Sequence, residues 1–251
     1  MKPERPRWLL TQNSDLRRIG VWNWPLPAHM VTLQTGEHFN VCPNAGACGR
    51  VCYAKFGTYQ FSNVKARHLA NLEYVLFDGD EWEQQMLAEV NHRKFRPTKV
   101  PTGDFLYVNC YDDEWMFNWL CVGGRAVRIH DGGDFFDQEY LDRWVRIAQQ
   151  TPHVLFYAYT KEVAMLKATV LPENFRVLYS LGGKQDHLID RDVDRHADVF
   201  PTWQALAEAG YWDQEQSDLI AVTAPTTRIG IVANNIRVAN KRFDGRTLSD
   251  M

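Results

Sequence analysis

The sequence has little that would place the protein in a membrane or on a nucleic acid. No apolar run in its 251 residues is long enough to span a bilayer. Residues 1–15 lack the apolar core of a secretory signal peptide. The formal net charge is −3, so no overall basic field attracts nucleic acid or an anionic membrane. We therefore expect a cytoplasmic protein without a membrane partner, in a compartment where thiols stay reduced.

Two familiar binding motifs are also incomplete. Asp190, Asp192 and Asp194 resemble the start of a calcium loop, but Arg195 stands where that loop needs glycine. The segment Gly182-Gly183-Lys184 lacks the upstream glycine and the following hydroxyl residue of a phosphate-binding loop. The sequence therefore predicts neither a calcium site nor a nucleotide site of these kinds.

Cysteine is scarce, but three of the five cysteines are clustered. Cys42, Cys48 and Cys52 share one loop rich in glycine, alanine, asparagine and proline, with the spacing C-x5-C-x3-C. This pattern favours a metal or cluster site over a disulfide, although three buried thiols without a ligand are the alternative. Three thiolates leave an open coordination position on a [4Fe–4S] cluster, whereas zinc would recruit a fourth ligand. Candidates for a fourth ligand are Cys110, Cys121, His38 and His68.

The hydrophobic pattern predicts alternating strands and helices. Strands are expected at 29–34, 105–108, 125–131, 153–159, 176–181, 197–200, 218–223 and 228–232, and helices at 63–77, 81–95, 137–150, 161–170 and 202–209. Such alternation is typical of βαβ units and a mostly parallel sheet. We expect an α/β fold that curls into a full or partial (β/α) barrel.

The chain is expected to form one barrel-like domain over residues 29–251. Residues 1–28, rich in arginine, tryptophan and proline, are interpreted as an irregular arm that packs its aromatic side chains onto this domain. Residues 97–124 mix apolar and acidic side chains. They are interpreted either as an insertion that covers a site or as a helix packed on the main body.

Several polar segments are expected at the carboxyl ends of strands, where chemistry gathers in barrel folds. Besides the cysteine loop, these are Gly132-Gly133-Asp134, Tyr159-Thr160-Lys161 and Gly182-Gly183-Lys184. We therefore expect the cysteine loop and the Gly-Gly-Asp segment to meet across the mouth of one barrel.

The cysteine loop and the Gly-Gly-Asp segment together resemble radical S-adenosylmethionine (SAM) enzymes. In that family three cysteines follow the first strand, the last precedes an aromatic residue, as in Cys52-Tyr53, and a Gly-Gly-Glu or Gly-Gly-Asp segment ends the second strand. The spacing here is wider than the family's C-x3-C-x2-C, and residues 97–124 lengthen the distance to Gly132. The resemblance implies a radical-SAM-like barrel with a [4Fe–4S] cluster on the three cysteines.

The same resemblance implies SAM as cofactor and an electron donor as partner. A 5′-deoxyadenosyl radical would abstract hydrogen from an unknown substrate, with a nucleic acid or nucleoside among the candidates. The implied site residues are Cys42, Cys48 and Cys52 for iron, Gly132, Gly133, Asp134 and Ser180 for SAM, and Lys161, Asp131 and Lys184 for catalysis, with Asp186 and His187 nearby.

Longer segments are similar to the uncharacterised gene product 88 family of phages and actinobacteria. They include CPNAGACGRVCYAKFGTY, RIHDGGDFFDQEYLDRW and YSLGGKQDH, and the similarity extends over nearly the whole chain. It implies that the cysteine loop and the Gly-Gly-Asp segment belong together, and it carries no stated activity.

Two alternatives remain open. The segments around Gly132-Gly133 and Gly182-Gly183 also resemble the DSGGF and GGL segments of tRNA-guanine transglycosylases, in which Asp131 or Asp134 would attack a nucleoside. The other alternative is a non-enzymatic, zinc-stabilised module whose basic and aromatic residues 5–24 contact nucleic acid.

Overall fold

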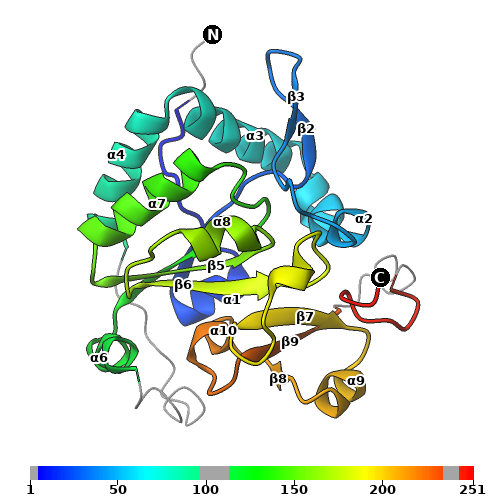
Figure 1. Ribbon diagram of the computed structural model, residues 1–251. Helices are drawn as coiled ribbons and strands as arrows, with labels where there is room; N and C mark the ends of the chain where they lie inside the picture. The colour runs from blue at the N-terminus through cyan, green and yellow to red at the C-terminus, as the bar shows by residue number, and fades with distance from the viewer. Residues whose placement is uncertain (1–4, 96–112, 234–242) are drawn as a thin grey trace.

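The computed structural model describes residues 5–95, 113–233 and 243–251. The central sheet contains β1 (Val21–Trp24), β4 (Arg125–Ile129), β5 (Val154–Thr160), β6 (Phe175–Ser180), β7 (His196–Phe200), β8 (Trp212–Asp213) and β9 (Arg228–Val232). Its seven strands are all parallel and run in the order β1-β4-β5-β6-β7-β9-β8 (Figure 1). The α/β class expected from the sequence is thus confirmed.

Helices cover both faces of this sheet (Figure 1). The helices of the described residues are α1 (Ser14–Ile19), α2 (Cys48–Val51), α3 (Ser62–Phe77), α4 (Gly79–Asn91), α6 (Glu114–Val122), α7 (Gln138–Gln150), α8 (Val163–Ala168), α9 (Trp203–Glu208) and α10 (Ile220–Thr223), of which α2 lies in the cysteine loop. One core lies under α3, α4, α7 and α8, and a second lies under α1, α6 and α10. Successive side chains of β5 alternate between the two cores, as the two-residue period of a strand requires.

The first strand of the sheet lies earlier in the chain than the sequence pattern suggested. Residues 1–28 were expected to be irregular, but their described part contains α1 and β1, and β1 pairs with β4. The expected strand at 29–34 contains β2 (Met30–Thr32), which forms a separate hairpin with β3 (His38–Asn40). Because β1 has buried side chains on both of its faces, it lacks the alternation that identifies a half-buried strand.

The expected strand at 218–223 is also wrong, because these residues include the helical turn α10. A short run that is buried throughout has no periodicity that separates a strand from a helix. The expected strand at 105–108 lies outside the described residues. Of the segment 97–124, the described end contains α6, which packs on the main body through the second core.

The described strands form an open sheet. β1 and β8 occupy its two edges, so no closed barrel is present in the described part of the chain. Across the sheet the strands from β1 to β9 follow their order in the sequence, and only β8 is out of order, at the edge beyond β9. Because β4, β5 and β6 are parallel neighbours, their carboxyl ends lie side by side. No helix in the described ranges is long and apolar enough to cross a membrane.

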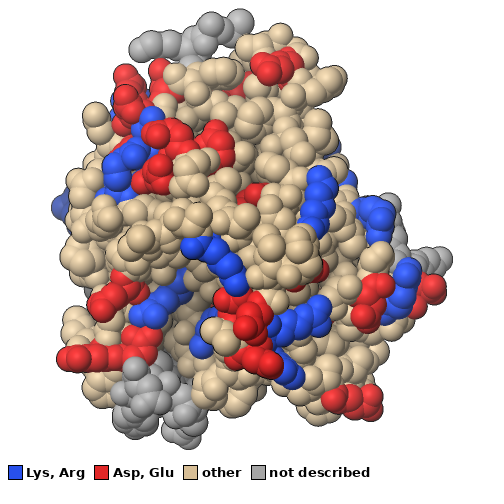
Figure 2. All heavy atoms as spheres, viewed as in Figure 1, with Lys and Arg blue, Asp and Glu red and all other residues tan. Residues whose placement is uncertain are grey.

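The aromatic residues near the N-terminus are used for packing. Trp24 is fully buried and donates its Nε1–H to the Tyr140 hydroxyl at 2.9 Å. The rings of Trp22 and Phe95 lie 4.3 Å apart, so Trp22 also contacts the main body. On the face drawn in Figure 2, basic and acidic side chains are interspersed. These contacts give Trp22 and Trp24 a role in packing.

Candidate cluster site at the carboxyl ends of the strands

A cavity of about 100 Å³ lies where the cysteine loop meets the carboxyl ends of β4, β5 and β6. All three clustered cysteines line it. The other residues in its wall include Tyr53, Arg128, His130, Asp131, Gly132, Gly133, Asp134, Tyr159, Thr160, Lys161 and Ser180. Segments that are about 140 residues apart in the sequence therefore meet at one cavity, as their expected positions at strand ends predicted.

The cysteine loop is held in place by backbone contacts with the loop that follows β6. The Cys48 amide donates to the Gly182 carbonyl at 3.1 Å, and the Lys184 amide donates to the Asn44 carbonyl at 2.9 Å. The Lys184 ammonium also donates to the Pro43 carbonyl at 2.7 Å. Lys184 does not line the cavity, so in this geometry it positions the cysteine loop.

The three thiols are free and half-buried. Burial, followed by the nearby Asp134 carboxyl, raises the pKa of the Cys42 thiol. Burial and the neighbouring Cys48 raise the pKa of the Cys52 thiol. Binding of a metal by these groups would therefore release protons, because a thiol must ionise to become a ligand.

The Gly-Gly-Asp segment is tied to its own chain by close packing and hydrogen bonds. A Cβ atom on Gly133, whose φ is +87°, would lie 2.7 Å from the Leu26 Cβ. The buried Asp134 carboxylate accepts hydrogen bonds from the Phe135 amide, the Thr160 hydroxyl and the Lys161 amide at 2.6 to 2.9 Å. Asp134 thus links the end of β4 to the end of β5, and most of its acceptor capacity is used.

Lys161 brings a buried positive charge to the cavity wall. Its ammonium donates to the Ser180 hydroxyl at 2.6 Å and to the carbonyl oxygens of Ser180 and Leu181 at 3.0 and 3.1 Å. These acceptors are uncharged, and Lys161 forms no ion pair within the described ranges. Lys161 and Ser180 therefore form one polar unit across the ends of β5 and β6.

Asp131 is held by tyrosines and arginine. The Tyr59 hydroxyl donates to Asp131 Oδ2 at 2.6 Å, and the Tyr53 hydroxyl donates to the Asp131 carbonyl. The Arg128 guanidinium lies 3.9 Å from Asp131 Oδ1 and 3.6 Å from Asp218 Oδ1. The Asp131 carboxylate is therefore held by contacts within the protein, as the Asp134 carboxylate is.

His130 contributes a buried ring nitrogen without a partner to the same wall. The Tyr140 hydroxyl accepts from the Trp24 Nε1–H and shares a hydrogen bond with His130 Nε2, 2.9 Å away. His130 Nδ1 has no partner in the described part of the chain. Burial and the neighbouring Arg128 lower the pKa of His130 to about 3, so the ring is neutral at ordinary pH.

The proposed fourth ligands do not join the three thiols. His38 lies on β3, His68 is buried on α3 and Cys121 is exposed on α6, and none of them lines the cavity. Cys110 lies outside the described residues. Within the described ranges, no group of three or more His, Cys, Asp or Glu side chains lies close enough together to hold one metal ion.

Three residues of the site were given no role by the sequence motifs. Arg128 and His130 line the cavity, and Glu162 accepts hydrogen bonds from Asn44 in the cysteine loop. All three lie next to segments that the sequence did indicate, so extending the strand-end segments by up to four residues would have included them.

Comparisons with known proteins agree on one family description. A family model described as "Gene product 88" matches residues 8–247. The "Gene 88 protein" of Mycobacterium phage L5 is 30% identical over 140 residues, which cover 53% of this chain and 48% of that protein. The chain thus spans about half the length of the curated relative it matches. No solved structure matches the chain significantly.

Proposed function

The chain belongs to the gene product 88 family, and we propose that it is an iron–sulfur enzyme of the radical SAM type in which Cys42, Cys48 and Cys52 hold a [4Fe–4S] cluster. The observation that carries this proposal is the shared cavity: the three cysteines and the Gly-Gly-Asp segment line it together at the carboxyl ends of adjacent parallel strands. The open sheet is compatible with the partial barrel of such enzymes, and that finer assignment is part of the proposal.

The number of available ligands is the argument for a cluster over a single zinc ion. Three thiolates are enough for a [4Fe–4S] cluster, which then has one iron open, whereas zinc would recruit a fourth protein ligand. Three cysteines line the cavity, while His38, His68 and Cys121 lie outside it.

The protein's own residues would bind and orient the cofactors. When bound together, the cluster and SAM would supply a 5′-deoxyadenosyl radical for hydrogen abstraction. Lys161 is the cation in the cavity wall that lacks an ion pair within the described ranges, so it is the proposed partner of an anionic group such as the methionine carboxylate. Asp134 and Thr160 fix the backbone of Lys161, while Gly132 and Gly133 let the end of β4 approach neighbouring backbone closely.

Metal analysis after anaerobic purification and reconstitution with iron and sulfide tests the proposal. We expect near-stoichiometric iron and sulfide in the unmodified protein and loss of most of both in Cys42→Ala, Cys48→Ala and Cys52→Ala. Cys121→Ala is the matched control, because this exposed cysteine lies outside the cavity. Protein that takes up zinc but no iron, or equal iron loss in the control, would overturn the assignment.

Cofactor use has its own readout. The reconstituted and reduced protein is expected to convert SAM to 5′-deoxyadenosine, which is measured by chromatography. A Lys161→Met variant keeps a side chain of similar length and removes the charge, so we expect it to bind SAM more weakly while retaining iron. Unchanged SAM affinity in this variant would show that Lys161 has no part in binding.

A further inference from the structure

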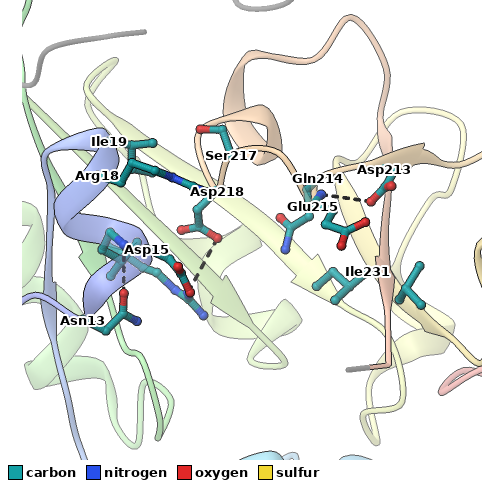
Figure 3. A pocket seen from close by; sticks show the side chains of 13 residues that line it. Asn13, Asp15, Arg18, Ile19, Asp213, Gln214, Glu215, Ser217, Asp218 and Ile231 are labelled. Atoms are coloured by element: carbon teal, nitrogen blue, oxygen red, sulfur yellow. Dashed lines mark hydrogen bonds and ion pairs between the residues drawn. The ribbon is translucent and has the colours of Figure 1, made fainter. Parts of the chain in front are cut away.

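A second and larger cavity, of about 400 Å³, lies on the face of the sheet that is covered by α1 and α10. Figure 3 shows Asp15 and Arg18 on one side of it and Asp213, Gln214 and Glu215 on the other. Its volume is within the range of small-molecule sites.

The wall of this cavity is mainly acidic. Four carboxylates line it, from Asp15, Asp213, Glu215 and Asp218, against two guanidinium groups. The charge of one of these, Arg128, is already balanced by Asp218 and Asp131, at 3.6 and 3.9 Å. The other three carboxylates form no ion pair within the described ranges, and the charge of Arg18 offsets one of them. The cavity therefore has a negative field that favours a cation.

The Asp218 carboxylate, next to Arg128, is held by several contacts. The Tyr157 hydroxyl and the Arg128 guanidinium both contact Asp218, while the Tyr159 hydroxyl donates to Gln214 Oε1. Arg128 also stacks over the Tyr159 ring at 5.2 Å. Burial of the tyrosines and the adjacent Asp218 raise the pKa of both phenols, so they remain protonated donors.

The two cavities are adjacent. Arg128 lines both of them, and its Nε is a buried donor without a partner in the described part of the chain. Tyr159, which hydrogen-bonds to Gln214 of the larger cavity, lines the cysteine cavity. A molecule in the larger cavity would thus lie beside the wall that carries the cysteine site.

We propose that the larger cavity binds a small polar molecule with a protonated amine, held by Asp213 and Glu215 on one side and Asp15 on the other. The Arg128 guanidinium, which lines the same cavity, provides hydrogen-bond donors for an oxygen of this molecule. That this molecule is the substrate is an assignment that rests on the proposed radical function. The binding site itself does not depend on that function.

Calorimetric titration of the full chain without iron tests the site independently of the cysteine chemistry. The probes are 1,5-diaminopentane, 1,5-pentanediol and glutarate, which share a five-carbon chain and are cationic, neutral and anionic. We expect saturable binding of the diamine and binding of the other two that is weaker by about tenfold or more, a free-energy difference of about 1.4 kcal/mol. Equal binding of the diol, or no saturable binding of the diamine at millimolar concentration, would overturn the proposal.

Paired variants separate this cavity from general surface charge. Asp213→Asn with Glu215→Gln removes two carboxylates of the cavity. The side-chain amide introduced at position 213 keeps an oxygen that can accept the Glu215 backbone N–H bond, which Asp213 accepts at 2.9 Å. Glu37→Gln with Glu208→Gln removes the same charge from exposed positions outside the cavity.

The two pairs are expected to behave differently. Diamine binding should be about tenfold weaker in the pair at positions 213 and 215 and unchanged in the pair at positions 37 and 208. Equal weakening in both pairs would show adventitious surface attraction only. Thermal unfolding of each pair confirms that the fold is retained.

Discussion

Glu162 has the carboxyl group whose ionisation bears most directly on the cysteine loop. It is 3% exposed and accepts hydrogen bonds from the Asn44 amide at 3.1 Å and from Asn44 Nδ2 at 2.5 Å. Burial and, to a smaller extent, the Asp134 charge raise the pKa of Glu162 to about 7. The folded protein therefore binds a proton at this position more tightly than the unfolded chain does.

The pH dependence of stability should reveal this group. Because the pKa is raised on folding, the contribution of Glu162 to stability is complete below pH 4.5 and is lost as the pH rises through about 7. In the unmodified protein this group should lower the unfolding free energy by up to about 3 kcal/mol as the pH rises over this interval, and Glu162→Gln should remove this decrease. Denaturant titrations at several pH values measure it, with the exposed Glu173→Gln as control. An unchanged slope in Glu162→Gln would contradict the assignment.

At this scale the sequence predicts which residues meet but not how each carboxylate is used. Cysteines and strand-end residues were expected to converge because parallel strands end at one edge of the sheet. The partners of Asp134 and Asp131 could not be predicted, since the Tyr59 contact joins residues 72 positions apart and depends on side-chain packing. Asp134 was expected to bind a cofactor; it lines the cavity, and its carboxylate also joins the ends of β4 and β5.

Among the structural elements, the contact between the cysteine loop and the loop after β6 determines the shape of the site. A Cβ atom on Gly46 would lie 2.7 Å from the Gly182 carbonyl oxygen and 2.8 Å from the Gly183 carbonyl carbon. Both neighbours are backbone atoms, so the cysteine loop would have to move away. Glycine between Cys42 and Cys48 is therefore required by close approach of two loops.

Comparison of Gly46→Ala with a second glycine substitution should distinguish the effect of the contact between these two loops from the effect of backbone strain alone. We expect a loss of about 1–3 kcal/mol in unfolding free energy and reduced iron uptake on reconstitution. Gly36→Ala is the comparison, because Gly36 has a φ of +87° but open space around it in the β2–β3 turn. It should cost about 1–2 kcal/mol and leave iron uptake unchanged. Equal iron uptake in both variants would argue against the loop contact.

The errors in the predicted elements have a common cause. β1 and α10 are short runs whose side chains are largely buried, so neither shows the period that distinguishes strands from helices. By contrast, α7 was predicted within one residue, because its stripe of apolar side chains faces one core and its other face is polar. The strands and helices from β4 to β6 were also recovered near their expected positions.

For the whole molecule, the N-terminal residues are part of the central sheet. Leu9, Leu10, Trp24 and Leu26 are all at most 2% exposed and belong to the larger core, and β1 is an edge strand. A chain that starts at His29 would lose these groups and expose one side of β4.

We therefore expect a chain that starts at His29 to show no cooperative thermal transition, whereas a chain that starts at Arg5 should unfold cooperatively. Differential scanning calorimetry measures both. If the shorter chain unfolded cooperatively within a few degrees of the longer one, residues 5–28 would not be needed for the fold.

A cluster held by Cys42, Cys48 and Cys52 has one iron open to another ligand, and this feature links the cavity to the proposed chemistry. Electron paramagnetic resonance of the reconstituted, reduced protein with and without SAM tests it most directly. The predicted result is a [4Fe–4S]⁺ signal that shifts when SAM is added, is lost in Cys48→Ala and persists in Cys121→Ala. A signal that SAM leaves unchanged, or protein without an iron–sulfur signal after reconstitution, would contradict it.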